Sequence, residues 1–342
     1  MISKIQRSTQ FQGLGSIDVH HHCFPETVAE LRSEFQDNKY GIAFTDFPVK
    51  PEEHLAYMDE VGVQTAVITP SIKNEWHNKF TAAEFVKLCE DSLEAQLEYV
   101  SFNPLRFGCF AILPLPHIQE TLDFIEKASS LPIPPDGYGV TTAMGKKYLG
   151  DPAFEPVWAA LSKQGSVVFV HPADTVMPPN MPFGPFVQEF AFDTCRAITT
   201  VISSGLLLRH PNVKFLFSHN GGAFPFLADR IGAQHIDEIV AKNNDGMRLR
   251  EILSTKNIYL DTSISSSMQY SLIKDLGIPS DHLLYATDFP YTRRGDSTSC
   301  YQAGWDAPYK SGLFDEQAME NIARNNALHV FPRLAKEFAK LK

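Results

Sequence analysis

The sequence predicts one (β/α)8 barrel, or TIM barrel, over residues 1–342. Eight short apolar segments alternate with longer helical stretches, and most of these segments are apolar on both faces, as strands buried between two layers are. Such alternation fits either a closed barrel or a doubly wound sheet. A doubly wound nucleotide-binding sheet would require a glycine-rich turn after its first strand, whereas this chain has DVHHH at residues 18–22. These histidines favour the barrel, whose functional sites form at the C-terminal ends of the strands.

The predicted strands are short runs rich in Val, Ile, Leu and Phe. They cover residues 15–20, 65–70, 107–115, 139–143, 167–171, 213–219, 258–262 and 283–288. The predicted helices cover 52–61, 82–100, 118–129, 156–164, 190–208, 224–239, 268–276 and 316–331. Local signals support these limits, because Asp151 and Pro152 form a turn before one helix and Gly165 ends it.

No linker composition divides the chain, so a single domain over residues 1–342 is expected. Two long insertions, 23–50 and 173–189, follow the first and the fifth predicted strands. Both would lie at the end of the barrel where functional sites form. They are expected to form a lid or an apolar pocket wall, and the alternative is a plain surface excursion.

The composition narrows the classes of function. The formal net charge is −10, and an acidic chain gains nothing from counterion release on nucleic acid. The five cysteines include no Cys-x-x-Cys pair, which argues against a disulfide scaffold or a structural zinc site. No signal-peptide core and no run of about 20 apolar residues is present, so a cytoplasmic protein without a membrane partner is expected.

Four predicted strands end in side chains that bind metals. His20 ends the first strand and His22 lies two residues later, His171 ends the fifth strand, Asp288 ends the eighth, and His219 ends the sixth. Side chains alternate along a strand, so His20 and His22 can grip one ion while the histidine between them points away. His171 and Asp288 would complete a four-ligand set with an open position for water or substrate. A lone histidine at a strand end is more often structural, but several on one face favour a metal site.

This pattern resembles the amidohydrolase superfamily, and more narrowly its non-oxidative decarboxylase branch, which includes aminocarboxymuconate-semialdehyde decarboxylase. Residues 150–158 and 217–230 are most similar to the 6-methylsalicylate decarboxylase group within that branch. The resemblance implies that His20, His22, His171 and Asp288 hold the metal in a barrel of the metal-dependent hydrolase type. It further implies that His219 transfers a proton and that Arg230 reaches a substrate carboxylate across a homodimer interface. Asn220 departs from the small residue usual after that histidine.

The same resemblance implies one divalent metal, Zn²⁺ with Mn²⁺ as the alternative. A two-metal site would use a lysine on the fourth strand, but Lys146 and Lys147 lie beyond it. The implied reaction is decarboxylation of a small ortho-hydroxy aromatic acid, 6-methylsalicylate to 3-methylphenol, by protonation of the ring carbon from His219 or Asp288. Apolar residues in 178–192, a segment rich in Phe and Pro, are expected to wall the ring.

Several alternatives stay open at this point. The substrate could be aminocarboxymuconate semialdehyde or another hydroxybenzoate. The same ligands could activate water against lactones or amides. A barrel that keeps the metal for structure or binding alone is the third alternative, although every expected ligand and His219 are present.

Overall fold

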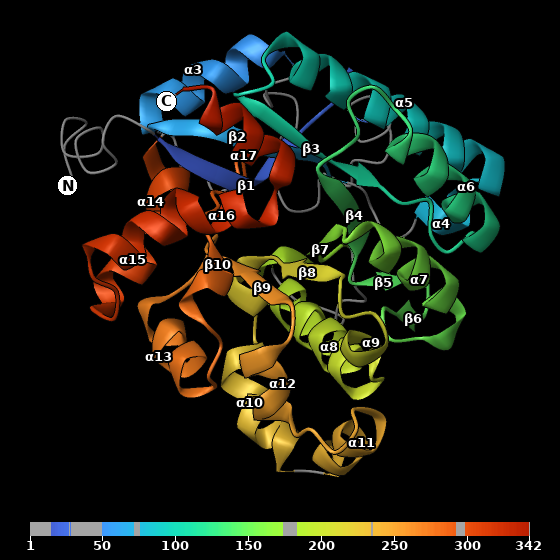
Figure 1. Ribbon diagram of the computed structural model, residues 1–342, viewed down its shortest axis with the longest axis vertical. Coiled ribbons are helices and arrows are strands. Elements are labelled where there is room, and N and C mark those ends of the chain that lie inside the picture. The colour runs from blue at the N-terminus through green and yellow to red at the C-terminus, as the bar shows by residue number, and fades with distance from the viewer. Residues whose placement is uncertain are drawn as a thin grey trace.

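Eight parallel strands follow one another in chain order around a barrel in the computed structural model, which describes residues 15–26, 28, 50–71, 76–173, 183–233, 235–291 and 298–341 (Figure 1). Each strand pairs in parallel with the next one. The strands are β1 (Ser16–Cys23), β2 (Val63–Pro70), β3 (Phe107–Ile112), β4 (Gly137–Thr141), β7 (Val167–His171), β8 (Lys214–Phe217), β9 (Ile258–Asp261) and β10 (Leu283–Leu284).

Backbone contacts between β1 and the segment after β10 close the ring. The Val19 N–H donates to the Tyr285 carbonyl at 3.0 Å, and the His22 N–H donates to the Phe289 carbonyl at 2.8 Å. A parallel bridge also joins His21 to Phe289. The predicted eight-stranded barrel is therefore confirmed.

Helices surround the strands. They are α3 (Pro51–Val61), α4 (Trp76–Lys79), α5 (Ala82–Phe102), α6 (Ile118–Ser129), α7 (Glu155–Gln164), α8 (Glu189–Ser203), α9 (Leu206–Arg209), α10 (Phe224–Gly232), α11 (Ile236–Asn243), α12 (Leu249–Thr255), α13 (Ser267–Asp275), α14 (Thr298–Ser311), α15 (Glu316–Glu320), α16 (Asn326–Val330) and α17 (Pro332–Ala339). Local chemistry sets their ends. At the start of α5, the Thr81 hydroxyl accepts from the Glu84 N–H, and the Glu84 carboxylate accepts in return from the Thr81 N–H. Gly165 ends α7 with a φ of 64°.

Short elements complete the described chain. They are the hairpin β5 (Ala143–Met144) and β6 (Lys147–Tyr148), the 3₁₀ turns η3 (Pro152–Phe154), η4 (Pro185–Val187), η5 (His219–Gly221) and η6 (Ser280–His282), and the π-helical turn η7 (Asn321–Asn325). The predicted helix 190–208 is divided at Gly205, whose φ of 77° is left-handed. The predicted helix 224–239 is likewise two helices, α10 and α11, and 316–331 is α15, η7 and α16.

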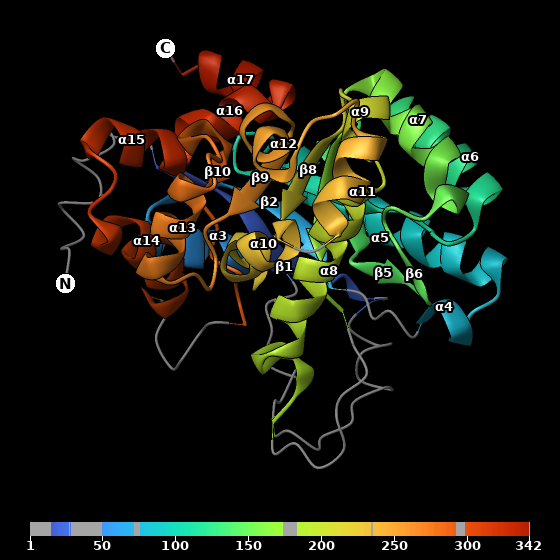
Figure 2. The same cartoon turned by 90° about the horizontal axis from the view of Figure 1, so that it is seen from below.

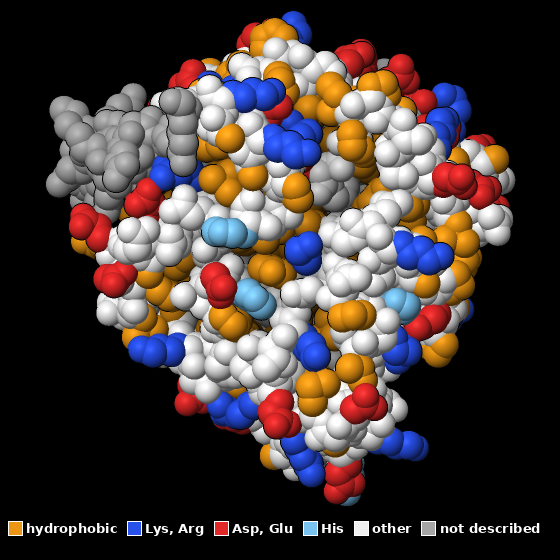
Figure 3. Space-filling model, viewed as in Figure 1, with side chains coloured by type: hydrophobic (Ala, Val, Ile, Leu, Met, Phe, Trp, Pro, Cys, Tyr) orange, Lys and Arg blue, Asp and Glu red, His pale blue; other side chains and the backbone are white. Residues whose placement is uncertain are grey.

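Apolar side chains fill the barrel, and the last two helices cover one end of it. Phe110, Phe169 and Leu216 from the strands form one buried cluster with Phe331 and Leu334 from the C-terminal segment. Figures 1 and 2 show α16 and α17 at this end. Charged side chains of both signs are scattered over the face seen in Figure 3. Because α16 and α17 cover this end, the opposite end, where the strands terminate, is open for the functional site.

Several predicted strand limits are wrong, by one to four residues. The sixth and the eighth strands were expected to reach His219 and Asp288, but β8 ends at Phe217 and β10 at Leu284. The φ angles of His219 and Asp288, 54° and 56°, are left-handed and keep both residues out of a strand. The third strand ends at Ile112, shortly before Pro114 and Pro116. The first strand continues past His20 to Cys23.

The insertions lie largely outside the described residues. Residues 29–49 of the first insertion and 174–182 of the second are not described, so the predicted lid is untested. The described part of the second insertion forms η4 and the start of α8. Within the described residues, no helix has the length and apolarity that crossing a membrane requires. Four cysteine side chains are described, and all four are buried free thiols.

Candidate metal centre

His20 and His22 project from β1 to the same side. Their Nε2 atoms lie 3.1 Å apart, and both side chains are buried. The bulge in β1 between Asp18 and His21 does not disturb this pairing. The alternation predicted from the sequence therefore places two imidazole nitrogens next to one another.

Asp288, which follows β10, and His171, which ends β7, face the same space. One Asp288 carboxylate oxygen, Oδ1, is 3.1 Å from the Nε2 atoms of both His20 and His22. The His171 ring centroid is 5.0 Å from the centroids of the two other rings. The structure thus brings together all four residues that the sequence nominates as metal ligands.

His219 lies beside this group rather than at the end of a strand. Its Nε2 is 3.5 Å from the Asp288 Oδ2, is buried, and has no hydrogen-bond partner among the described residues. One donor atom each from His20, His171, His219 and Asp288 lies within 4.8 Å of the others. Geometry alone therefore offers His219 as a ligand as well as a proton-transfer group.

The electrostatics of the group favour a cation. Burial, together with the neighbouring His20 and His22, holds the pKa of His171 well below its usual value. Burial would raise the pKa of Asp288, but His20 and its other histidine partners hold it well below the usual value. Burial lowers the pKa of His20, yet the carboxylates of Asp288 and Asp261 raise it to about 10. The two carboxylates thus stabilise positive charge in this buried space.

The donor set fits one divalent metal ion. Ligand nitrogens and oxygens about 2.0–2.2 Å from one ion lie roughly 3 Å from each other, which matches the 3.1 Å separations among His20, His22 and Asp288. The Nε2 of His219 is buried and has no hydrogen-bond partner among the described residues, so it is a further nitrogen available to the ion. Imidazole and carboxylate donors suit Zn²⁺ and its first-row neighbours.

Asp261 is a site residue that the sequence reasoning missed. It ends β9, is fully buried, and places its Oδ2 2.8 Å from the Nδ1 of His20. Its Oδ1 accepts from the backbone N–H of His219 at 3.0 Å. The signal was present, because Asp261 is a carboxylate at the end of a barrel strand, like the ligands that were identified.

His21 points away from the metal centre into a second buried network. Its Nδ1 is 2.9 Å from the Asp18 Oδ2, and its Nε2 is 2.9 Å from the Nδ1 of His54. Asp18 also accepts from the N–H and the hydroxyl of Thr287, at 3.0 and 2.6 Å. This network connects β1 to Thr287, the residue before Asp288. It therefore holds the backbone that positions the Asp288 carboxylate.

We expect His21→Ala to lower the free energy of unfolding by about 2–5 kcal/mol, because it leaves Asp18 and His54 short of a partner and removes a ring stacked on Phe289. The metal content should stay at the wild-type level. Denaturant unfolding and elemental analysis measure the two effects, with His20→Ala as the contrasting variant that loses metal. An unchanged unfolding midpoint, or metal loss equal to that of His20→Ala, would contradict this assignment.

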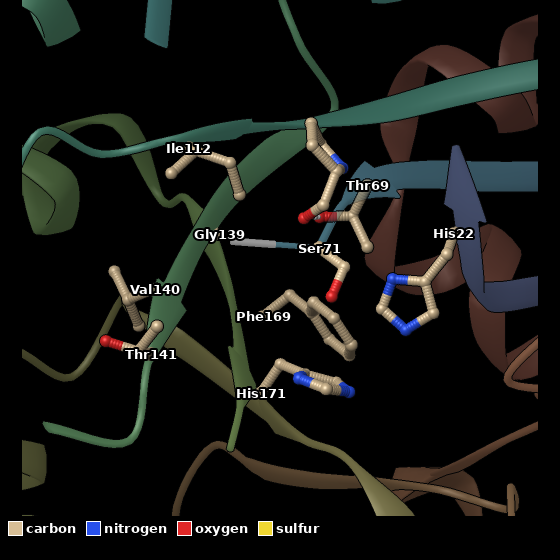
Figure 4. A pocket seen from close by; sticks show the side chains of 10 residues that line it. His22, Thr69, Ser71, Ile112, Gly139, Val140, Thr141, Phe169 and His171 are labelled. Atoms are coloured by element: carbon tan, nitrogen blue, oxygen red, sulfur yellow. Dashed lines mark hydrogen bonds between the residues drawn. The ribbon is translucent and has the colours of Figure 1, made fainter. Parts of the chain in front are cut away.

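A small pocket adjoins the donor group between β2, β4 and β7. Figure 4 shows the rings of His22, Phe169 and His171 and the hydroxyl of Ser71 converging on it. The lining residues are His22, Thr69, Pro70, Ser71, Ile112, Gly139, Val140, Thr141, Phe169 and His171. Apolar walls beside a group of imidazoles suit a flat, largely apolar ligand that carries a charged end.

Other predicted residues lie differently. Arg230 is exposed near the end of α10, and no hydrogen bond or ion pair holds its side chain within the described part of the chain. Asn220 is fully buried, has a φ of 55°, and its amide nitrogen and oxygen have no described partner. Lys146 and Lys147 are exposed at the β5–β6 turn.

Left-handed backbone is concentrated around the donors. His219, Asn220 and Asp288 are three of the five non-glycine residues with positive φ in the described chain. Such residues cost about 1–3 kcal/mol each and persist where the surroundings over-determine them. Here the turns aim His219 and Asp288 at one another.

Comparisons with known proteins agree with this geometry. The amidohydrolase family matches residues 17–333, and the chain belongs to that family. Decarboxylase yanB of Aspergillus niger is 28% identical over 340 residues, which cover 93% of this chain and 87% of that protein. The 6-methylsalicylic acid decarboxylase of Penicillium expansum is 26% identical over 340 residues, with coverage of 94% and 97%.

A solved structure shares the fold. The 5-carboxyvanillate decarboxylase of Novosphingobium aromaticivorans, with bound manganese and 3-methoxy-4-hydroxy-5-nitrobenzoic acid, has a TM-score of 0.75 at 16% identity and covers 94% of this chain and 98% of that chain. The family match and the relatives confirm the expected resemblance to the decarboxylase branch and the expected class of enzyme.

Proposed function

We propose that this chain is a metal-dependent, non-oxidative decarboxylase of small ortho-hydroxy aromatic acids, with 6-methylsalicylate, giving 3-methylphenol and CO2, as its substrate. The observation that carries the proposal is the convergence of four imidazoles, those of His20 and His22 fully buried, and one carboxylate on a single space beside an apolar pocket. The named activity of the relative from Penicillium expansum supports this choice of substrate.

We propose that His20, His22, His171 and Asp288 hold one divalent cation, Zn²⁺ or alternatively Mn²⁺. The short separations among their donor atoms support this set, and the manganese bound to the similar 5-carboxyvanillate decarboxylase supports a divalent ion. When bound, the cation supplies the positive charge that holds a carboxylate and stabilises charge on the adjacent ortho oxygen.

The proton reaches carbon from the chain itself. An aryl anion is too unstable to form, so the ring carbon that bears the carboxylate must be protonated before CO2 leaves. His219 is the proposed acid, because its Nε2 is buried and lies 3.5 Å from the Asp288 Oδ2. That carboxylate oxygen can accept the proton of the His219 Nε2 and give it back. The substrate reacts with its ortho hydroxyl ionised. The new C–H bond forms first, and the ortho oxygen becomes a ketone. The bond to the carboxylate then breaks, and its electron pair restores the aromatic ring and the phenolate, which takes up a proton to give the phenol.

The pocket is the proposed place for the ring. Phe169 and Val140 offer apolar walls, and the ring centroid of Phe190 lies 6.2 Å from that of His171. Phe190 falls within the 178–192 segment that was expected to wall the ring, and residues 178–182 of that segment lie outside the described residues.

Gly139→Ala is expected to discriminate against substituted acids. A Cβ at this position would come within 2.7 Å of the Ile112 Cδ1 and 3.5 Å of the Thr69 Oγ1, so it would shrink the pocket. Losing room for one methyl group is worth about 1–3 kcal/mol, or roughly 10–200-fold in kcat/KM. Steady-state rates on 6-methylsalicylate should fall by this factor, while the smaller salicylate loses less and serves as the internal control. Equal losses of rate on both acids would show that the methyl group of 6-methylsalicylate does not lie beside Gly139.

We further propose that the protein is a cytoplasmic homodimer in which Arg230 reaches the substrate carboxylate of the partner. The exposure of Arg230 on α10, one turn beyond the half-exposed Phe226, supports such a surface.

Product analysis tests the proposed function. The purified protein, loaded with Zn²⁺ or Mn²⁺, is incubated with about six aromatic acids and with a matched set of lactones. Release of CO2 from ortho-hydroxybenzoates, with little from isomers that lack the ortho hydroxyl, is the expected result. Ring opening of lactones without CO2 release would make the protein a hydrolase instead.

A further inference from the structure

Asp261 contacts both key histidines through a single buried carboxylate. Its two oxygens have different partners. Oδ1 accepts from the His219 N–H at 3.0 Å, from the Ser263 N–H at 2.9 Å and from the Ser263 hydroxyl at 2.6 Å. Oδ2 faces the Nδ1 of His20 at 2.8 Å, and the Ser263 hydroxyl lies 3.2 Å from the same nitrogen. The carboxylate therefore links the ends of β1, β8 and β9.

The partners of Oδ1 fix its role. Two of them are backbone N–H groups, which can only donate, so Oδ1 can only accept. Oδ2 is then the acceptor for an N–H at the Nδ1 of His20. A neutral imidazole that carries its proton on Nδ1 has its lone pair on Nε2. That Nε2 is the atom 3.1 Å from both His22 and Asp288.

We propose that Asp261 is a positioning residue that sets the tautomer of His20 for metal binding and fixes the backbone of His219 for proton transfer. Carboxylates that hold metal-binding histidines in this manner orient the ring and fix the tautomer. The hydrogen bond to the His219 N–H also anchors a residue whose φ is 54°. The ligand and the acid are thus aligned by one group, an inference that rests on the proposed roles of His20 and His219.

Asp261→Asn is the decisive variant, because the structure dictates how the amide must lie. The three donors around Oδ1 require the amide oxygen there, so the amide NH2 must face the Nδ1 of His20. His20 would then accept at Nδ1 and carry its proton on Nε2, which removes the lone pair that the metal needs. Competition of the metal-free protein with a chelator for Zn²⁺ should show an affinity about 10–100-fold below wild type.

Ser263→Ala is the matched control. It removes the hydroxyl donor to Oδ1 but keeps the carboxylate and both backbone donors, so the affinity for Zn²⁺ should change less than about threefold, since one neutral hydrogen bond is worth about 0.5–1.5 kcal/mol. Wild-type affinity in Asp261→Asn, or an equal loss in Ser263→Ala, would overturn the proposal.

The tautomer itself is the second readout. Protein labelled with ¹⁵N-histidine and loaded with Zn²⁺ should show a hydrogen-bonded Nδ1–H resonance that is absent from Asp261→Asn. A wild-type spectrum in which the ligand nitrogen of His20 is Nδ1 would refute the proposal even if the variant fails to fold. Neither readout depends on the substrate, so loss of metal affinity in a protein that decarboxylates nothing would refute the proposed reaction and leave the role of Asp261 intact.

Discussion

His219→Asn is expected to slow CO2 release by about 10²–10⁴-fold while the protein keeps its full metal content. The variant removes the buried Nε2 that lies 3.5 Å from the Asp288 Oδ2, which is the proposed source of the proton. Asparagine is well suited to the position, because it tolerates the left-handed φ of 54° found there. Single-turnover CO2 release and elemental analysis of the same sample measure the two properties.

The control for this variant is His329→Asn, which makes the same change at an exposed histidine of α16, at the opposite end of the barrel. It should leave both properties unchanged. Full turnover in His219→Asn would remove His219 from the mechanism. Loss of metal from His219→Asn would instead indicate that His219 is a ligand. The geometry also allows this, because one donor atom of His219 lies within 4.8 Å of donor atoms of His20, His171 and Asp288.

Asp288→Asn is expected to have the larger effect, with CO2 release lowered by at least about 10⁴-fold and weaker metal binding as well. Asp288 is the carboxylate that lies 3.1 Å from two of the imidazoles and 3.5 Å from His219. The amide removes the negative charge that offsets the cation and the group that exchanges a proton with His219. Asparagine again tolerates the φ of 56°, so the backbone turn should survive.

Asp281→Asn is the matched control, because Asp281 is an exposed carboxylate just before β10, at the other end of that segment. It should behave as wild type in metal content and in CO2 release. If Asp288→Asn kept both, the carboxylate would be neither ligand nor proton carrier, and the proposed mechanism would be wrong.

The order of the barrel strands and the convergence of the donors could be predicted because they depend on short-range rules. Alternation along β1 places His20 and His22 on one side, and the parallel arrangement brings His171 to the same end. Neither inference requires knowledge of which distant residues each side chain contacts. The same rule applied to the seventh strand would have identified Asp261.

The sequence could not predict features that depend on distant contacts. β10 is only two residues long, because the N–H groups that follow it donate to groups outside the strand pairing. The Tyr285 N–H donates to the Ile322 carbonyl, and the Thr287 N–H donates to Asp18, 269 positions away. The partners of His21 are likewise set by α3, through His54. The proposed role of Arg230 depends on contacts with a second copy of the chain, which short-range rules do not predict.

Removal and return of the metal tests the central claim most directly. The protein is stripped with a strong chelator, assayed for CO2 release on its best acid, and titrated with Zn²⁺ or Mn²⁺ while bound metal is counted. The donor group formed by His20, His22, His171 and Asp288 predicts that activity disappears with the metal and returns in full at one ion per chain. A stripped protein that contains no metal and still releases CO2 at the original rate would contradict it.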